Sequence, residues 1–554
     1  MPWEPTLPEA GAPFEIFNLL SWEFRLAAEL VGRNAEREAL LDWARNGPGL
    51  RIRFLLGPGG AGKTRLAGEV ASALTGWNAG FSPLERDEPL QLPRGGLLAV
   101  LDSPEAWPDQ VKALLSEAMR MGTPSAPIRL LLLSRRPRSE WDRVIEECDA
   151  TARCDAQEVG IGALGPQPAL ALFRGAVTRL AAHRRRAAPV VDETGFVTWV
   201  KQQPELHALP LFITAAAIHL VDEPADTLEL RAHRIVDALV RRERRHLNLA
   251  GKARGFGKVG GSRLVGLAAL RDGLDAAALR RLAAPELELG LPEPTQVVDA
   301  TRMAGLAHGN RVLAPGPDIV AAELLRQVIQ EADDRGPAWV WETLCDPGSL
   351  QMELIDRRLR DIVTLHGPAE TGVRDSMIAA VKGRPDRAKS WSDLFYSDAG
   401  GFRLSPVSVA IGRALLERAE LSGEERASIL NNLSVHLSDA GDAAGALAAI
   451  REAVETYRRL AQENAARFVP DLATSLNNLS LRLSDAGDAA GALAAICEAV
   501  EIRRRLAGEN AARFAPDLAT SLNNLSLRLS DAGDAAGALA AIREAVETHR
   551  RLAG

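Results

Sequence analysis

Eight consecutive residues near the amino terminus have the types and the spacing that phosphate chemistry requires: Gly57-Pro-Gly-Gly-Ala-Gly-Lys-Thr64 fits the pattern Gly-x4-Gly-Lys-Thr. In this pattern glycines let backbone N–H groups crowd around a phosphate, the lysine reaches the β- and γ-phosphates, and the threonine hydroxyl binds Mg²⁺. The motif therefore predicts a site for ATP or ADP with Mg²⁺. The residues expected to contact the nucleotide here are Gly57, Pro58, Gly59, Gly60, Ala61, Gly62, Lys63, Thr64 and Arg65.

Further side chains with suitable chemistry follow two apolar runs. Asp102 ends one run and is expected to hold Mg²⁺ through water. Most hydrolytic relatives of such proteins place a second acid next, but Ser103 stands there, and Glu105 is the nearest carboxylate that could polarise the attacking water. Arg135 follows the other run and is expected to contact the γ-phosphate. The residues thus predict nucleotide binding and leave open whether ATP is hydrolysed at all or only slowly.

Strands and a helix must position these residues. The apolar runs at 51–56, 97–102 and 128–133 are predicted strands, and the periodicity over 65–74 predicts a helix directly after the glycine-rich loop. A strand, a glycine-rich loop and a helix in this order form the context in which the motif binds phosphate. We therefore predict an α/β P-loop NTPase domain with a parallel sheet over residues 31–155.

These segments together resemble the signal-transduction ATPases with numerous domains (STAND), which include the NB-ARC-like switches of apoptosis and plant immunity. Val31-Gly32-Arg33 corresponds to the hydrophobic-Gly-Arg motif of that family, which lies near the adenine, and Thr64-Arg65-Leu66-Ala67 is also typical of it. Ala208-Leu209-Pro210-Leu211 resembles the Gly-x-Pro element, whose proline packs on the base. The resemblance implies that Gly32, Arg33 and Pro210 contact the nucleotide.

The same resemblance implies two more domains behind the P-loop domain, a helical lid over 156–250 and a winged-helix-like domain over 251–335. Residues 313–325 look like the end of the winged helix. The family's Met-His-Asp signature is missing from this region, and Pro317-Asp318 stands where it is expected. A direct histidine contact to ADP is therefore not expected.

Near-identical units of 46 residues fill the carboxyl-terminal region, where Leu-Asn-Asn-Leu-Ser recurs with its first Asn at Asn431, Asn477 and Asn523. Gly487 is expected to end one helix and Asp488 to cap the next. The units resemble tetratricopeptide repeats, in the longer form of kinesin-light-chain-type repeats, and imply an all-α solenoid. In such arrays the three asparagines line a groove and bind the backbone of an extended peptide. Alternatively, they cap or brace neighbouring helices.

The composition limits the remaining functions. The chain has 554 residues, a net charge of −7 and 46% hydrophobic residues, which suits three to five globular domains and argues against wholesale disorder. The acidity also argues against nucleic acid as a partner. A secretory leader and an apolar run of ~20 residues are both missing, which indicates a cytoplasmic protein that does not enter a membrane. The other regions are an N-terminal extension over 1–30, a helical bridge over 336–420 and the repeat array over 421–554.

Other conspicuous residues are given structural interpretations. Gly255-Phe-Gly-Lys-Val-Gly260 spells the dinucleotide fingerprint, but no apolar strand precedes it, so a linker is expected. Cys148 and Cys154 lack a second pair at zinc spacing and are interpreted as free thiols. The basic runs 183–186 and 241–245 are interpreted as solvated helix faces. Core positions are expected for Trp107, Trp339, Trp341 and Trp391.

The preferred hypothesis is a signal-transduction switch controlled by nucleotide. The array receives a protein or peptide partner, and exchange of ADP for ATP exposes a surface for self-assembly into a homo-oligomer. The alternative is an adaptor or scaffold in which the array does the work and the nucleotide is a permanent structural element. A transcription regulator ranks third, because the winged helix is the only candidate for a DNA-binding module.

Overall fold

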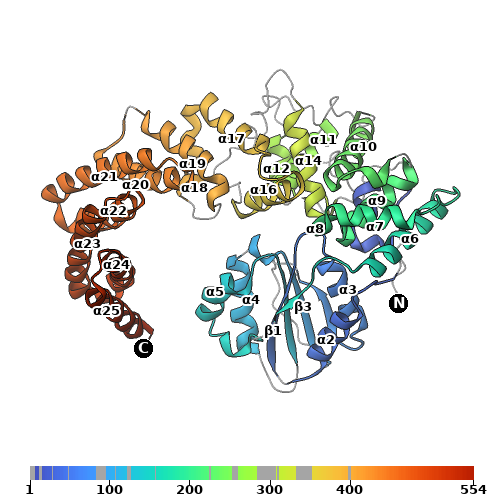
Figure 1. The fold of residues 1–554 in the computed structure, drawn as a ribbon, viewed down its shortest axis with the longest axis horizontal. Helices are drawn as coiled ribbons and strands as arrows, with labels where there is room; N and C mark the ends of the chain where they lie inside the picture. The colour runs from blue at the N-terminus through green and yellow to red at the C-terminus, as the bar shows by residue number, and fades with distance from the viewer. Residues whose placement is uncertain are drawn as a thin grey trace. The chain divides into compact units, whose positions relative to one another are not determined.

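The structure is a computed structural model, drawn in Figure 1. It describes residues 7–10, 15–27, 29–47, 49–82, 95–106, 108–121, 127–155, 158–223, 226–252, 260–271, 273–282, 307–308, 311–331, 352–396, 401–418 and 420–553. The chain divides into two compact units, residues 1–331 with 353–370 and residues 332–352 with 371–554. Several predictions fall outside the described residues: those on the glycine-rich run at 255–259, on Trp107, Trp339 and Trp341, and on the first part of the bridge, 336–351.

A five-stranded sheet forms the centre of the first unit. Every pairing in it is parallel, and the strands lie in the order β2-β3-β4-β1-β5. Their bounds are β1 Leu50–Leu56, β2 Asn78–Phe81, β3 Leu97–Asp102, β4 Ile128–Ser134 and β5 Val159–Gly160. Because β4 lies between β1 and β3, the residues after these three strands meet at one edge of the sheet. The three predicted strands are confirmed, and the parallel sheet makes this part of the chain an α/β fold as expected.

Helices cover both faces of this sheet, as buried parallel strands require. Figure 1 shows α4 and α5 on one face and α2 and α3 on the other. The core on the α4 side combines alternate residues of the strands, such as Phe54 and Leu132, with Leu115 and Trp141. The bounds of these helices are α2 Asn34–Arg45, α3 Lys63–Ala73, α4 Pro108–Met121 and α5 Asp142–Glu147, with short 3-10 helices at η2 Pro104–Ala106, η3 Arg138–Trp141 and η4 Thr151–Arg153.

Helices dominate the rest of the first unit. The segment predicted as a lid contains α6 Pro166–His183, α7 Glu193–Gln202, α8 Pro204–His207, α9 Pro210–Asp222, η5 Thr227–Glu229 and α10 Ala232–Lys252. The amino-terminal elements are α1 Glu15–Leu20 and η1 Trp22–Phe24. Beyond α10 come α11 Gly260–Leu270, α12 Ala276–Leu282, an antiparallel pair β6 Ala307–His308 and β7 Arg311–Val312, α14 Asp318–Gln330 and α16 Met352–His366.

Buried charges attach α1 to the lid helices. Glu15 is fully buried and pairs with Arg184 and, at 3.8 Å, with Arg242. The backbone N–H of Ile16 donates to Glu243 Oε2 at 3.0 Å. The described part of the predicted N-terminal extension is therefore packed into the first unit.

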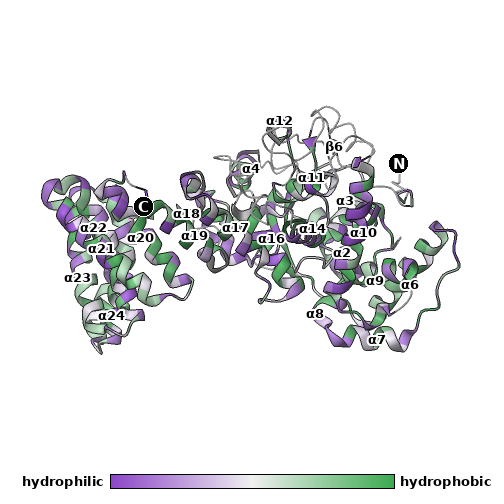
Figure 2. Ribbon diagram, turned by 90° about the horizontal axis from the view of Figure 1, so that it is seen from above, coloured by the Kyte–Doolittle hydropathy of each residue, from purple (hydrophilic) through white to green (hydrophobic). Residues whose placement is uncertain are grey.

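The described part of the second unit is all helical. It contains α17 Gly372–Gly383, η7 Pro385–Trp391, α18 Ser392–Tyr396 and α19 Gly401–Leu416, followed by the array helices α20 Gly423–Asp439, α21 Ala443–Glu463, α22 Ala465–Asp485, α23 Ala489–Glu509, α24 Ala511–Asp531 and α25 Ala535–Ala553. Figure 2 shows hydrophobic and hydrophilic residues along each of the labelled array helices, as expected where one face packs on a neighbour. Trp391 is buried, as predicted.

The turns inside the repeats form as the sequence predicts. Gly487 follows α22 with a φ of +81°, a conformation that favours glycine. The Asp488 side chain then accepts a hydrogen bond from Gly491 N at 2.9 Å and caps α23. Within the described residues, no helix combines the length and the apolar character that crossing a membrane requires.

Candidate nucleotide-binding site

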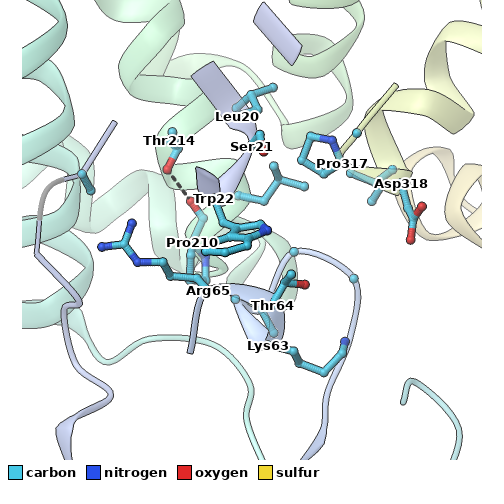
Figure 3. Close-up of a pocket in the computed structure, with 18 of the residues that line it drawn as sticks. Leu20, Ser21, Trp22, Lys63, Thr64, Arg65, Pro210, Thr214, Pro317 and Asp318 are labelled. Atoms are coloured by element: carbon cyan, nitrogen blue, oxygen red, sulfur yellow. Dashed lines mark hydrogen bonds between the residues drawn. The ribbon is translucent and has the colours of Figure 1, made fainter. Parts of the chain in front are cut away.

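The first unit contains a cavity of about 480 Å³ at the carboxyl-terminal edge of its sheet. Three groups of residues form most of its lining: the loop between β1 and α3 with the start of α3 and the ends of β3 and β4, the first turns of α9 and α14, and part of the segment from Leu19 to Arg33. Leu164, Leu172 of α6 and Arg357 of α16 complete it. Figure 3 shows labelled side chains from all three groups around one space. A cavity of this size, at this edge of a parallel sheet, is where α/β proteins place their ligands.

The glycine-rich loop exposes backbone without side chains to the cavity. Gly60 and Gly62 have φ values of +82° and +91°, which a residue with a side chain rarely adopts. A Cβ on Gly57 would lie 2.3 Å from the carbonyl oxygen of Ile161, so β1 can approach β5 here only with glycine. Helix α3 begins at Lys63 and points its amino terminus at the loop, an arrangement that favours an anion.

Lys63 is a buried cation whose hydrogen-bond acceptors are neutral. Its Nζ donates to the carbonyl oxygens of Gly57 and Pro58 at 2.6 and 3.1 Å. Burial, together with the nearby charge of Arg135, lowers the pKa of Lys63 to about 8. An anion at this position would favour the charged form of the lysine, so the side chain fits a phosphate.

Thr64 and Asp102 bring two side-chain oxygens together at the first turn of α3. Thr64 Oγ1 donates to Asp102 Oδ2 at 2.8 Å. Burial raises the pKa of Asp102 although the bond from Thr64 opposes this shift. Oxygen atoms of this kind are ligands that Mg²⁺ prefers, and a cation would also favour the charged carboxylate, so the pair fits the predicted metal site.

Arg135 reaches the glycine-rich loop from the end of β4. A Cβ on Gly59 would lie 3.2 Å from its Cζ. The guanidinium donates from Nη2 to Asp318 Oδ2 at 2.9 Å and from Nη1 to Asp361 Oδ1. Arg135, the predicted γ-phosphate contact, is thus paired with two carboxylates, one at the start of α14 and one on α16.

Asp318 is the centre of this charge cluster. Its Oδ1 accepts hydrogen bonds from Arg357 at 2.5 Å and from Arg358 at 2.8 Å. Burial alone would raise the pKa of Asp318, but Arg357, Arg358 and Arg135 outweigh burial and hold this pKa well below its usual range. The carboxylate is therefore an internal anion within the cavity, surrounded by three guanidinium groups.

Glu105 lies behind the turn that carries Arg135. Its Oε1 accepts hydrogen bonds from Ser134 Oγ at 2.5 Å and from the backbone N–H of Arg135 at 2.7 Å. The side chain thus holds the turn in place. Ser103 has a φ of +54°, an uncommon value outside glycine, and its hydroxyl lies 3.4 Å from Asp102 Oδ1.

Of the family-implied residues, Pro210 lies at the glycine-rich loop, whereas Arg33 contacts the chain just after β5. Leu211 N donates to Gly60 O at 3.2 Å, and a Cβ on Gly62 would lie 3.7 Å from Pro210 Cγ. Arg33 donates to Gly162 O and to Glu36 at 3.3 Å.

The structure brings most of the predicted site residues to the cavity. Those that line it are Arg33, Gly59, Gly60, Ala61, Gly62, Lys63, Thr64, Arg65, Asp102, Arg135 and Pro210. Gly32, Gly57, Pro58 and Glu105 are not among the lining residues. Gly32 packs on the lid, since a Cβ there would lie 2.6 Å from Pro168 Cβ. Sequence reasoning missed Trp22, Arg357 and Asp361, and it did not assign Asp318 to the site.

The repeat asparagines join successive units. Asn431 Oδ1 accepts hydrogen bonds from Ser475 Oγ at 3.1 Å and Asn478 Nδ2 at 3.2 Å. Asn477 repeats this arrangement with Ser521 at 3.1 Å and Asn524 at 3.0 Å. Asn523, the third member, is exposed on α24. These contacts are those of the bracing alternative, and binding of a peptide stays a prediction.

Comparison with known proteins identifies the repeats. The model of the tetratricopeptide repeat matches residues 426–464, 472–510 and 518–554. No curated protein matches the sequence.

Some solved structures share low similarity with the chain. The Aeropyrum pernix ORC2 protein, solved as ADPNP-ADP complexes, is 16% identical over 56% of this chain and 97% of that chain, with a TM-score of 0.29. BtubC from P. vanneervenii is 19% identical over 53% and 92% (TM-score 0.24), and MamA is 12% identical over 37% and 91% (TM-score 0.22). At these TM-scores the likenesses carry no argument about this chain.

Proposed function

We propose that this protein is an ATP- and ADP-binding switch whose repeat array binds a protein or peptide partner. The observation that carries the proposal is the position of Arg135, which is paired with Asp318 and Asp361 in the cavity that also contains Lys63. An arginine beside a phosphate-binding loop, held by carboxylates from other helices, can exchange one anionic partner for another. The coarser function, protein interaction through tetratricopeptide repeats, follows from the array itself.

Different residues of the cavity are proposed to bind the phosphates, Mg²⁺ and the base of the nucleotide. The backbone of residues 59–62 and the ammonium of Lys63 would hold the phosphates, and Thr64 with Asp102 would hold Mg²⁺, the latter through water. Gly32, Arg33 and Pro210 are proposed to position the base, Arg33 and Pro210 from the cavity lining and Gly32 through its close packing on Pro168. Bound ATP supplies one anion more than ADP, at the γ-phosphate, and this difference is what the switch would read.

Arg135 is proposed as the residue that reads this difference. With ADP it would stay on Asp318 and Asp361 and so hold α14 and α16 against the loop. With ATP it would turn to the γ-phosphate and release those helices. Moving such an equilibrium from 1:99 to 99:1 needs ~5.5 kcal/mol of differential binding, and charge-assisted hydrogen bonds contribute roughly 1.5–3 kcal/mol each. About two to four such bonds, in excess of those that Arg135 gives up with Asp318 and Asp361, are therefore enough.

The cavity supports binding better than rapid hydrolysis. Ser103 stands where a second acid would polarise water, and Glu105 is engaged by the Ser134–Arg135 turn. A slow ATPase would serve a switch, because the active state then persists. Self-assembly into a homo-oligomer in the ATP state, and a cytoplasmic location, complete the proposal.

The test is to identify and exchange the nucleotide of the purified full-length chain. Denaturation should release ADP from the wild type and no nucleotide from Lys63→Ala, and mass spectrometry identifies what is released. Light scattering with the partner present should give a larger mass with a non-hydrolysable ATP analogue than with ADP. Equal masses with the two nucleotides would instead support the adaptor, in which the nucleotide is structural. A Lys63→Ala protein that still carries nucleotide would refute the site.

A further inference from the structure

The amino-terminal segment, residues 15–27, contributes an unexpected wall to the nucleotide cavity. Leu19, Leu20, Ser21, Trp22 and Arg25 of this segment line the cavity together with the phosphate-binding loop. Among the described residues that line it, Trp22 carries the only aromatic ring. In Figure 3 the indole lies in the middle of the view, with Thr64 and Lys63 below it and Pro317 and Asp318 to its right.

The indole of Trp22 is wedged against the backbone of α3. A Cβ on Gly68 would lie 2.5 Å from Trp22 Cζ3 and 2.9 Å from Cη2, so only glycine admits the ring at this position. The ring of Phe81, at the end of β2, lies 5.3 Å away between centroids and is tilted by 40°. The ring therefore has a fixed place, set by two elements of the P-loop domain.

Both ends of the segment are held as well. Its beginning is tied to the lid by the buried Glu15, which pairs with Arg184 and Arg242. Near its end, Arg25 pairs with Glu69 of α3 at 3.5 Å and its carbonyl oxygen accepts a hydrogen bond from Arg179 of α6 at 2.8 Å. Arg25 itself has a φ of +47°, a conformation that non-glycine residues adopt mainly where the surroundings impose it. The segment thus connects the lid to α3 and carries Trp22 between them.

The position of Trp22 along α3 indicates which part of a nucleotide it meets. Gly68 is one helical turn beyond Thr64, which corresponds to about 6 Å along the axis, on the side away from the phosphate-binding loop. The cavity lining also includes the apolar side chains of Leu26, Leu30, Val31 and Leu172, so apolar surface adjoins the polar loop. The charged residues Arg25, Glu29 and Arg33 come from the same stretch of chain. A ligand with phosphates at one end and a planar, uncharged ring at the other, joined by a short linker, would match this arrangement of polar and apolar lining.

We propose that Trp22 is the stacking platform for the base of the bound nucleotide. This inference rests on the proposed nucleotide binding and deepens it, because it names the ligand as a nucleoside phosphate that the protein distinguishes from inorganic polyphosphate. It also gives the N-terminal segment a function in binding. Stacking of a base on an aromatic side chain corresponds to a roughly 5- to 150-fold difference in affinity when the ring is removed.

The experiment compares ATP with inorganic tripolyphosphate, which has the phosphates but no base. Binding of both to the full chain is measured by calorimetry in the presence of Mg²⁺ for wild type, Trp22→Leu, Trp22→Phe and Gly68→Ala. Leucine keeps the apolar character of position 22 and removes the ring, whereas phenylalanine keeps a ring. Gly68→Ala leaves Trp22 in the sequence but places a methyl group in the space that its ring occupies.

We expect Trp22→Leu and Gly68→Ala to weaken ATP binding about 5- to 150-fold, with little change for tripolyphosphate. Trp22→Phe should recover most of the ATP affinity. Wild-type ATP affinity in Trp22→Leu would overturn the inference, and so would an equal loss for ATP and tripolyphosphate, since the ring would then only support the fold. Failure of the proposed nucleotide binding is seen separately, as a wild-type protein that binds neither ligand or a Lys63→Ala protein that binds both normally.

Discussion

The nucleotide cavity and the repeat array are built from different kinds of contact. In the cavity the contacts are made by charged side chains and occur once each: Arg135 pairs with Asp318 and Asp361, and the Lys63 ammonium donates to two carbonyl oxygens. In the array the same neutral hydrogen bonds recur from unit to unit, at Asn431 and again at Asn477. A single substitution should therefore abolish nucleotide binding in the cavity but only reduce the stability of the array. The predictions below test that difference, from the largest expected effect to the smallest.

Lys63→Ala should abolish nucleotide binding, with a loss of affinity for ATP of about 100-fold or more, since two charge-assisted bonds of ~1.5–3 kcal/mol are removed. Calorimetry with ATP and Mg²⁺ measures the loss. The melting temperature without nucleotide serves as the control, because Lys63 is buried without a carboxylate acceptor and its removal should not unfold the sheet. A loss of ATP affinity below tenfold would mean that nucleotide binding is distributed over many weak contacts, as the stability of the array is.

Raising the pH should weaken ATP binding without any substitution. Burial and the charge of Arg135 lower the pKa of Lys63 to about 8, and a bound phosphate favours the charged form and so raises this pKa. Binding then takes up a proton above pH 8, and the affinity should fall about tenfold per pH unit there and stay level below it. Lys63→Arg keeps its charge at these pH values and is the matched control. An affinity that falls equally in both proteins would assign the pH effect to another group.

Asp318→Asn should shift the balance between ATP and ADP. The substitution removes the negative charge that holds Arg135, so the preference for ATP over ADP should rise about tenfold, the equivalent of one charge-assisted hydrogen bond of ~1.5 kcal/mol. Competition of the two nucleotides for one fluorescent analogue gives this ratio directly. The double substitution of Arg135 and Asp318 should return the ratio toward that of Arg135→Ala alone. An unchanged ratio in the single variant would separate this ion pair from the switch.

Asn477→Ala should destabilise the array by about 1–2 kcal/mol, because Ser521 and Asn524 lose their shared acceptor. Asn523→Ala provides the matched control, since Asn523 has the same place in its unit but is exposed. Thermal unfolding should therefore distinguish the two variants. Equal loss of partner binding in both variants, with little change in stability, would point to the peptide groove.

Arg504→Ala should have the smallest effect. Its pair with Glu544 at 2.5 Å connects two neighbouring units on the exposed surface, and such pairs contribute about 0–1 kcal/mol. The pair between Arg458 and Glu498 repeats this contact one unit earlier, so Arg458→Ala should give the same small loss. Unfolding in low and high salt measures both. A loss above 2 kcal/mol in either would show that charges matter in the array as they do in the cavity.

The sequence predicted the parts of the site that depend on local spacing. The glycine-rich loop, Lys63 and Thr64 are neighbours in the chain, and Asp102 and Arg135 follow strands whose apolar runs are unmistakable. Asp361 could not be assigned in this way, because it reaches Arg135 across 226 residues and lies within an ordinary helical pattern. Trp22 belongs to the same class, since its place depends on the missing side chain of Gly68. Long-range pairs between single residues leave no periodic signal.

The asparagines of the array show the converse. Their repetition every 46 residues was evident from the sequence, but repetition alone did not distinguish a groove from a brace. The distances to Ser475 and Asn478 show that Asn431 braces the next unit, and binding of a peptide stays a prediction. A repeated residue shows that a contact recurs, and only the structure identifies the other partner.

The recurrence of identical junctions in the array has a consequence for how the number of repeats can change during evolution. Asn431 meets Ser475 and Asn478 as Asn477 meets Ser521 and Asn524, so removing or duplicating one 46-residue unit would recreate a junction that already exists. Unequal recombination within the gene could thus lengthen or shorten the array in a single event and still yield a folded product. The length of the array can therefore change without the invention of any new contact.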